Sequence, residues 1–373
     1  MPLSALDQQR LSEALLLAEG SIGLSEPNPR VGCVIGREDG CVLGRGFTQE
    51  AGGAHAEVMA MRDCLRLGHE LSGSTVWVTL EPCAHHGRTP PCADTLIAAG
   101  VARVVVATQD PFTQVNGAGL LRLRKAGIQV DLAEGEIARA ARELNIGYFS
   151  RIRRLRPWLR LKVASSLDGR TALLNGQSQW ITGPAAREDG HRWRKRAGAV
   201  LSGIGTVLED DPRLDVRLVD TVRQPMRVVV DSRLATPTSA RVLAPPGGVL
   251  IFTASTDTAL AGSLRASGAD VVIVPDADGK VDLLSMLKQL ADRGVNELHV
   301  EAGHKLNASL LRAGLVDELL IYLAPRLLGI GREMAAFGPL QSLSESMDFR
   351  FTDVQRVGED LRVVARPAER DAF

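Results

Sequence analysis

The sequence has no net charge and no long apolar run. Its 44 basic residues balance 44 acidic ones, which argues against a protein that coats nucleic acid and favours small neutral or anionic ligands. No apolar stretch approaches the ~20 residues that a membrane-spanning helix requires. The first 20 residues mix charges with leucines at helical spacing and lack the pattern of a signal peptide. We therefore expect a soluble protein that binds neither membranes nor nucleic acid.

Cysteine is scarce and odd in number, with five thiols at Cys33, Cys41, Cys64, Cys83 and Cys92. This does not suit a disulfide framework and indicates a reducing, cytoplasmic location. Internal repeats and low-complexity tracts are also lacking. Because 373 residues exceed the ~250 to 300 that a single core usually accommodates, we expect two globular domains.

Strand and helix patterns alternate in both halves, which predicts two α/β domains, 1–150 and 151–373. At their border the basic run SRIRRLRPW (150–158) favours a solvated linker over a nucleic-acid patch. The predicted strands are 31–35, 41–47, 75–80, 103–108, 158–164, 226–231, 248–253, 270–275, 297–303 and 319–325. The predicted helices are 55–67, 93–99, 282–292 and 305–313.

The stretch EPCAHHGRTPPC (81–92) carries two thiols that could bind a metal. Cys92 follows two prolines at the start of a predicted helix, where backbone amides favour a thiolate. Upstream, His55 and Glu57 open another predicted helix and can share one site only from its first turn. Zinc prefers such a set of one imidazole and two thiolates, with a fourth position open for water. Glu57 could then move a proton from that water to a leaving group.

H-x-E followed by P-C and a second cysteine is the pattern of zinc-dependent deaminases. Two alternatives are a closed Cys2His2 zinc site that uses His85 or His86, and buried thiols without a metal; the closed site would leave Glu57 without a purpose. Eight residues separate the cysteines, a longer spacer than in most nucleoside and nucleic-acid deaminases. Within it, Arg88 and Thr89 could contact a phosphate or ring oxygen, or could belong to a proline-stiffened surface loop.

These stretches closely resemble the bifunctional riboflavin-biosynthesis deaminase/reductase family. The resemblance implies a cytidine-deaminase-like α/β/α domain, zinc on His55, Cys83 and Cys92, Glu57 as proton shuttle, and Asn28 near the pyrimidine. Met59 departs from a histidine frequent in relatives, but that position is not a ligand. The matching stretches are PNPRVGCVIG (27–36), HAEVMAM (55–61), VTLEPCAHHGRTPPCADTLIAAGV (78–101) and QDP (109–111).

The second half shows no dinucleotide fingerprint, because Leu208 replaces the third glycine after G-I-G at 203–205. Its residues resemble the reductase half of the same family, which implies a dihydrofolate-reductase-like α/β domain that uses NADPH. Ala302 and His304 depart from the family pattern. The matching stretches are LKVASSLDGRTA (161–172), SQWITG (178–183), GTVLEDDPRLDVR (205–217), VVVDS (228–232), VEAGHKLNASLL (300–311) and LVDELLIYLAP (315–325).

The resemblance also assigns individual residues in this half. Arg194 and Arg217 could clamp a sugar phosphate, although each alone could be a surface arginine, and Trp180 alone could be a core residue. The cofactor-binding pattern matches Ala164, Trp180, Thr206, Asp210, Ser232 and a turn of Gly303, His304, Lys305, Leu306, Asn307, Ala308 and Ser309. The substrate-binding pattern matches Ser178, Arg194, Leu214, Arg217 and Glu301.

Two consecutive steps of riboflavin biosynthesis are thereby implied. The first is zinc-dependent deamination of 2,5-diamino-6-ribosylamino-4(3H)-pyrimidinone 5′-phosphate. The second is NADPH-dependent reduction of the ribosyl group to ribityl, with Asp210 or a water as the acid. A homo-oligomer, dimer or tetramer, is the family expectation. Two alternatives are a zinc deaminase of tRNA or nucleosides with a non-catalytic second domain, and a non-enzymatic zinc-stabilised binding protein.

Overall fold

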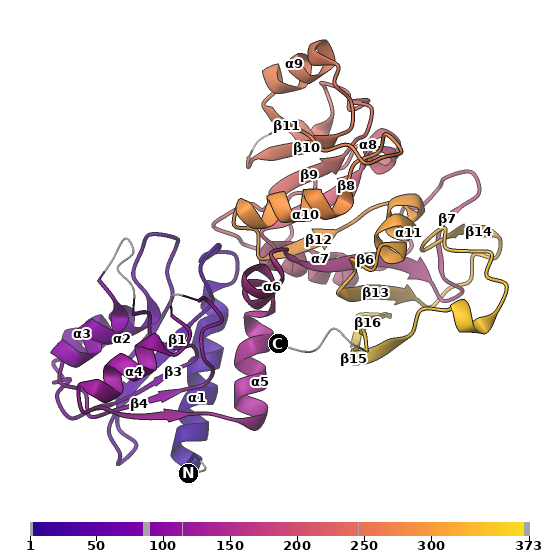
Figure 1. Cartoon of the computed structure of the whole chain (residues 1–373). Coiled ribbons are helices and arrows are strands. Elements are labelled where there is room, and N and C mark those ends of the chain that lie inside the picture. Colours follow the sequence, from indigo (N-terminus) through magenta and orange to yellow (C-terminus); the bar gives the residue numbers. More distant parts are fainter. Residues whose placement is uncertain (1–2, 85–89, 114, 245, 369–373) are drawn as a thin grey trace. The chain divides into compact units, whose positions relative to one another are not determined.

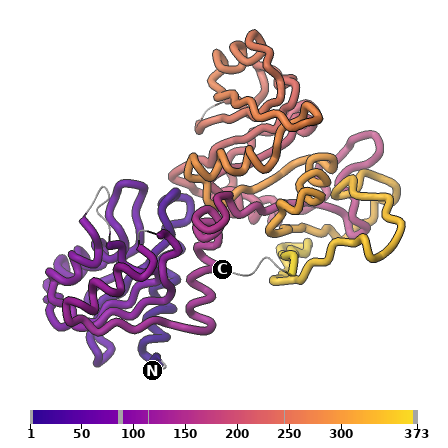
Figure 2. Tube along the Cα trace, viewed as in Figure 1, coloured from indigo at the N-terminus to yellow at the C-terminus, as the bar shows by residue number. Residues whose placement is uncertain are grey.

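The structure, a computed structural model, describes residues 3–84, 90–113, 115–244 and 246–368. Its contacts divide the chain into two units, Met1–Leu155 and Arg156–Phe373. The coloured ribbon in Figure 1 and the tube in Figure 2 show that each unit uses one continuous stretch of chain. Each unit therefore has its own sheet and core.

A five-stranded sheet in the order β2-β1-β3-β4-β5 lies at the centre of the first unit. β1 is antiparallel to β2 and β3, whereas β3, β4 and β5 run parallel. The central strands are unbroken apolar runs because helices cover both faces of the sheet. The strands are β1 (Gly32–Gly36), β2 (Val42–Phe47), β3 (Thr75–Val78), β4 (Arg103–Val106) and β5 (Gln129–Leu132).

Helices α1 and α5 cover one face of this sheet, and α2, α3 and α4 cover the other (Figure 1). Ser4 and Asp7 form a capping box that starts α1. On the α1 face the side chains of Leu11, Val34 and Trp77 form the core. The helices are α1 (Ala5–Ala18), α2 (Ala56–Arg66), α3 (Cys92–Ala98), α4 (Ala118–Lys125), α5 (Gly135–Leu144) and α6 (Ile146–Arg154), with a 3₁₀ turn at Glu19–Ser21.

The basic run that we expected to be a solvated linker is helical. Residues 150–154 belong to α6, which ends where Leu155 adopts a positive φ of 56°. Tyr148 and Phe149 on this helix are buried, and their rings meet edge to face with centroids 6.3 Å apart. The linker prediction was wrong because it rested on the arginines alone, whereas the two aromatic residues before them belong to the same helix and are buried.

The second unit contains a nine-stranded sheet in the order β11-β10-β9-β8-β12-β6-β13-β16-β15. Strands β11 to β13 in this order are parallel, and β16 and β15 add an antiparallel hairpin. The strands are β6 (Trp158–Ser166), β8 (Ala199–Gly203), β9 (Met226–Val230), β10 (Val249–Thr253), β11 (Ala269–Ile273), β12 (Glu297–Val300), β13 (Glu318–Ala324), β15 (Phe349–Val357) and β16 (Asp360–Pro367). A separate pair joins β7 (Arg170–Leu173) to β14 (Gly331–Glu333).

Helices cover both faces of this larger sheet as well. α10 and α11 pack on the face formed by Leu161, Leu201 and Val228, and α8 and α9 pack on the opposite face around Val229 and Ile251. α7 lies on the same face as α8, over β6, β13 and β16. The helices are α7 (Pro184–Arg196), α8 (Ile204–Asp210), α9 (Thr258–Ala266), α10 (Leu283–Asp292) and α11 (His304–Arg312), with 3₁₀ turns at Arg241–Leu243 and Leu343–Glu345.

Every strand and helix that the sequence patterns predict has a counterpart within a few residues of its expected bounds. One stretch differs in type, because the predicted turn 303–309 is Gly303 followed by the first six residues of α11. In the part of the chain that the structure describes, no helix combines the length and apolar character needed to cross a membrane.

Candidate active sites

Helix α2 lies unusually close to β2, and this contact positions its first turn. Cβ atoms added at Gly44 and Gly46 would fall 2.3 Å from backbone atoms of Ala60, so only glycine permits the approach. His55 is the N-cap residue of α2 in extended backbone conformation, and Glu57 lies in the first turn. The two side chains therefore reach the same cavity, as predicted for residues at a helix start.

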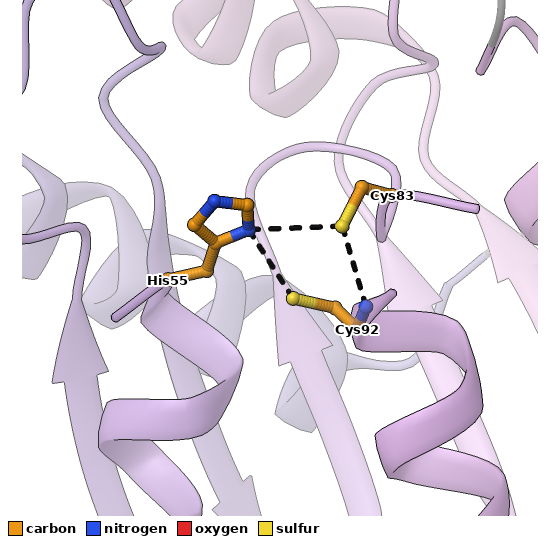
Figure 3. A group of neighbouring side chains, drawn as sticks. All are labelled: His55, Cys83 and Cys92. Carbon is orange, nitrogen blue, oxygen red and sulfur yellow. Dashed lines mark hydrogen bonds between the residues drawn. The ribbon is translucent and has the colours of Figure 1, made fainter. Parts of the chain in front are cut away.

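His55, Cys83 and Cys92 converge from three segments of the chain (Figure 3). Their ligand atoms lie within 4.8 Å of one another. The Nδ1 atom of His55 is 3.7 Å from the Cys83 sulfur and 3.3 Å from the Cys92 sulfur. One imidazole nitrogen and two thiols fit a zinc ion with a fourth position left for water. Among the described residues this is the single cluster of potential metal ligands.

The electrostatics of the cluster favour a thiolate and a proton-exchanging acid. Hydrogen bonds from the Cys92 thiol, from His55 and from the Cys92 amide hold the pKa of the Cys83 thiol well below its usual range, against the effect of burial. Burial, reinforced by the negative charge of Cys83, raises the pKa of Glu57 to about 7. A carboxyl with that pKa can both accept and release a proton near neutral pH.

A buried carboxylate that sequence reasoning missed supports the loop of Cys83. Glu81 accepts hydrogen bonds from four backbone amides, those of Asp110, Gly117, Gly119 and Leu120, at 2.9 to 3.3 Å. It thus joins the end of β3 to the start of α4. Nothing in the sequence distinguishes this glutamate from an ordinary surface acid, because its partners lie about 30 to 40 residues away.

The cavity beside the cluster has a volume of about 480 Å³ and is large enough for a nucleotide-sized ligand. Asn28 lines it. The predicted contacts Arg88 and Thr89, like His85 and His86, lie outside the described residues. Asp110, Tyr148 and Arg151, which were not predicted, also line the cavity. Tyr148 donates a hydrogen bond of 3.0 Å to Asp110, and burial is the main cause that raises the pKa of Asp110 to about 6.

The remaining cysteines lie away from this cluster. Cys33 is buried in β1 and Cys64 is buried in α2, so both are core residues. Cys41 is exposed just before β2. No described cysteine besides Cys83 and Cys92 joins the group of potential ligands.

Predicted site residues of the second unit gather at the carboxyl ends of parallel strands. Ala164 lies near the end of β6, Thr206 follows β8, Ser232 follows β9, and Glu301 and Gly303 follow β12. Ends of neighbouring parallel strands meet at one edge of a sheet, which is where α/β proteins bind ligands. A Cβ built on Gly303 would lie 3.6 Å from the Thr206 hydroxyl, so the segments after β8 and β12 touch.

The predicted substrate residues form an ion-pair cluster at the same edge. Arg194 on α7 binds Glu301 through two parallel hydrogen bonds of 2.5 and 2.9 Å and donates a third to the carbonyl of Asp215. Arg217 pairs with the Asp215 carboxylate at 2.7 Å. Lys162, which sequence reasoning missed, lies 3.7 Å from Glu301. Although burial opposes ionisation, Arg194 and Lys162 hold the pKa of Glu301 well below its usual range.

The other predicted residues of this unit differ in their exposure. Leu214 is buried with a positive φ of 54°, and Ser178 is half-buried between β7 and α7. Trp180 is 61% exposed, with the Arg187 guanidinium 4.5 Å from its ring centre. Asp210, at the end of α8, has a pKa raised mainly by burial. The residues His304, Lys305, Leu306, Asn307, Ala308 and Ser309 form the first part of α11.

The first site thus has the ligands, acid and cavity of a zinc-dependent deaminase, joined to a second α/β unit with a polar site at its strand ends. Residues 4–108 match the model of the cytidine and deoxycytidylate deaminase zinc-binding region, and residues 157–363 match that of the RibD C-terminal domain.

Whole-chain comparisons agree with these two matches. The chain is 42% identical over 368 residues to riboflavin biosynthesis protein RibD of Escherichia coli K12, covering 95% of this chain and 98% of that one. It is 40% identical to the Aquifex aeolicus protein of the same name, covering 95% and 97% of the two chains. Its structure superposes on Acinetobacter baumannii RibD with a TM-score of 0.88 at 38% identity, covering 98% and 99%.

A deaminase/reductase from Thermotoga maritima gives a TM-score of 0.86 at 32% identity, covering 97% of this chain and 99% of that one. The chain belongs to the RibD family, the bifunctional deaminase/reductase enzymes of riboflavin biosynthesis. The cytidine-deaminase-like and dihydrofolate-reductase-like folds are confirmed. The alternatives of a non-enzymatic protein and of a non-catalytic second half are set aside.

Proposed function

We propose that the first unit deaminates 2,5-diamino-6-ribosylamino-4(3H)-pyrimidinone 5′-phosphate and that the second reduces the product with NADPH to 5-amino-6-ribitylamino-uracil 5′-phosphate. The Thermotoga maritima relative is described as a diaminohydroxyphosphoribosylaminopyrimidine deaminase/5-amino-6-(5-phosphoribosylamino)uracil reductase. The observation that carries the proposal is the convergence of His55, Cys83, Cys92 and Glu57 at one cavity.

In the deaminase step, His55, Cys83 and Cys92 would hold a zinc ion, which supplies a water acidic enough to act as a nucleophile at neutral pH. The Glu57 carboxyl would accept the proton of this water and deliver it to the departing amine, so that ammonia leaves as a neutral molecule. The surrounding cavity would keep bulk water from the carboxyl and so maintain its pKa. Asn28 would orient the pyrimidine ring.

In the reductase step, the residues that follow β8, β9 and β12 would bind NADPH. Backbone amides at the start of α11 suit a pyrophosphate, and Arg194, Arg217 and Glu301 would bind the ribosyl phosphate chain. NADPH supplies hydride to the C1′ carbon of the open-chain sugar. The proton would come from Asp210, a bound water, or Lys162, whose ammonium group lies beside Glu301.

A paired assay on the purified chain tests this assignment. Ammonia release and NADPH oxidation are followed from the diaminopyrimidine ribosyl phosphate, with and without a zinc chelator. We expect NADPH consumption only after ammonia appears, loss of both signals on chelation, and continued reduction of supplied aminouracil. If folded, zinc-loaded protein gives neither signal, the proposed substrates are wrong. Glu57→Gln should abolish ammonia release while zinc content and aminouracil reduction stay unchanged.

Assembly and location follow the family expectation of a cytoplasmic homo-oligomer, a dimer or tetramer. Strand β15 is an edge of the nine-stranded sheet, and its residues Phe351 and Val354 are 71% and 54% exposed. An edge strand with exposed apolar side chains is suited to pairing with a second copy. Light scattering on the wild type and on Phe351→Lys tests this, since a monomer at all concentrations would contradict it.

A further inference from the structure

Two of the predicted substrate residues of the second unit, Leu214 and Arg217, lie on a segment without helix or strand, which we call the 211–217 loop. Within it, Asp211 and Leu214 adopt positive φ angles of 41° and 54°, a region of backbone conformation that residues other than glycine rarely occupy. Such a conformation persists only where the surrounding structure holds it in place. The contacts that anchor this loop therefore decide where its two substrate residues lie.

Helix α7 holds the loop from one side through two side chains one turn apart. The Nη1 atom of Arg194 donates a hydrogen bond of 2.8 Å to the carbonyl of Asp215. The backbone N–H of Arg217 donates a hydrogen bond of 3.1 Å to the Nδ1 atom of His191. Arg194 also binds Glu301, which follows β12. Helix α7 thus sets the spacing between Glu301 and Arg217, which come from separate segments of the chain.

His191 is suited to this task because it is buried and uncharged. It is 5% exposed, and its Nδ1 atom can accept a hydrogen bond only while the imidazole is neutral. Burial, reinforced by the charges of Arg194 and Arg217, lowers the pKa of His191 to about 4, whereas Glu301 and Asp215 oppose this shift. The acceptor is therefore present at neutral pH, beside two arginines whose charge would disfavour an imidazolium.

We propose that His191 is a positioning residue of the reductase step, which holds the 211–217 loop in the conformation that binds the ribosyl phosphate chain. The inference rests on the proposed function, because it takes Leu214 and Arg217 as substrate residues. His191 acts through the loop, and its role does not require contact with the substrate. It removes the freedom of the loop before the substrate arrives, and this lowers the entropic cost of binding. The residue therefore acts on KM rather than on kcat.

Gln224 anchors the other side of the same loop and offers a second way of loosening it. Its side-chain oxygen accepts a hydrogen bond from the Val216 N–H, and its side-chain nitrogen donates one to the Val216 carbonyl, both at 2.8 Å. Neither bond involves α7. If the order of the loop sets substrate affinity, the loss of either anchor should have the same kinetic signature.

Steady-state kinetics of NADPH oxidation with supplied aminouracil ribosyl phosphate test this role. We expect His191→Leu to raise KM for the aminouracil by about five- to ten-fold and to leave kcat and KM for NADPH within about two-fold of the wild type. His191→Asn should restore most of the affinity, because its side-chain oxygen can take the place of Nδ1. Gln224→Met should raise the same KM. Should the leucine variant not fold, His191→Ala carries the same expectation.

Arg192→Met is the matched control, because Arg192 is an exposed neighbour on α7 that pairs with Glu188 on the same helix. It should leave both KM values unchanged. Amide exchange of residues 211–217, followed by mass spectrometry, reports on the loop directly and should be faster in His191→Leu than in the wild type or in His191→Asn. Ammonia release should be equal in all variants, since they leave the first unit untouched.

A purely structural role of His191 predicts a different result. The inference would fall if His191→Leu lowered the melting temperature without changing KM for the aminouracil, or raised KM for NADPH to the same extent. It would also fall if His191→Asn restored nothing, or if the loop exchanged no faster in His191→Leu.

Failure of the proposed function gives a separate outcome, in which the wild type oxidises no NADPH with the aminouracil compound. Calorimetric binding of ribose 5-phosphate is then compared between the variants, which share an unchanged first unit. Weaker binding by His191→Leu than by the wild type and by His191→Asn would still support the role of the loop. Equal or absent binding would end it.

Discussion

Gly46→Ala should separate the two activities, because the close contact between α2 and β2 leaves no room for a methyl group. The added Cβ would lie 2.3 Å from the Ala60 nitrogen and 2.5 Å from the Ala56 carbonyl oxygen, against an ordinary contact of at least 3.4 Å. The first turn of α2 must therefore move by about 1 Å, at a cost of about 1 to 3 kcal/mol in the free energy of unfolding. His55 and Glu57 move with this turn.

The thiols of Cys83 and Cys92 come from other segments, so the same displacement changes the triangle of metal ligands. Functional groups have to stay within about 0.5 Å of their productive geometry, and a shift of about 1 Å can cost about 100-fold in rate. We expect zinc content measured by metal analysis to fall and ammonia release to drop by at least about 100-fold. NADPH oxidation with supplied aminouracil should persist.

Gly262→Ala is the matched control, because a Cβ at this exposed helical glycine of α9 meets no atom within 4 Å. It should leave both activities unchanged and raise stability slightly. If Gly46→Ala retained zinc and deaminated within about three-fold of the wild type, the close packing of α2 would not be what holds the ligands in place.

Three further changes test the buried charges. The raised pKa of Asp110, about 6 against 3.8, favours its protonated form in the folded state, so this carboxyl increasingly destabilises the fold as pH rises from about 4 to 6. Asp110→Asn should therefore stabilise the first unit by up to about 3 kcal/mol above pH 7, measured as slower amide exchange in its central strands. An equal stabilisation at pH 4 would refute this. Glu301→Gln should lower reductase kcat/KM at least about ten-fold, since it removes the partner charge of Arg194, whereas ammonia release should stay unchanged. An unchanged kcat/KM of the reductase would mean that Glu301 does not belong to the substrate site. Arg160→Met removes the cation between buried Glu297 and Glu318 and leaves each with one arginine partner, Arg196 or Arg366. It should cost about 3 kcal/mol in urea unfolding, against at most about 1 kcal/mol for the exposed pair in Arg66→Met; equal losses would contradict this account.

Local sequence patterns were sufficient for much of the fold and for the metal cluster. Valine-rich runs such as 103–106 and 226–230 are buried on both faces, which makes them recognisable as central strands. His55 and Glu57 could be placed in one site because a helix start allows residues two apart to share a cavity. Cys92 at the start of α3 follows the same reasoning.

Residues whose roles depend on distant partners could not be predicted in this way. Glu81 is bound by amides that follow it by about 30 to 40 residues, and Lys162 meets Glu301 across neighbouring strands. Arg151 lies in a basic run whose composition resembles that of a surface segment, so its place beside a cavity could not be predicted. Only the fold shows that α6 turns this arginine towards a cavity while Arg153 stays exposed.

The four amide hydrogen bonds to Glu81 have a consequence for how the protein exchanges its metal. They hold the segment before Cys83 in shape through contacts that include no metal ligand. The segment that carries Cys83 is therefore held in shape by contacts that do not depend on a metal, so its ordering should add little entropic cost to the binding of zinc. We expect chelator-treated protein to keep the fold of this segment and to regain deaminase activity when zinc is added back.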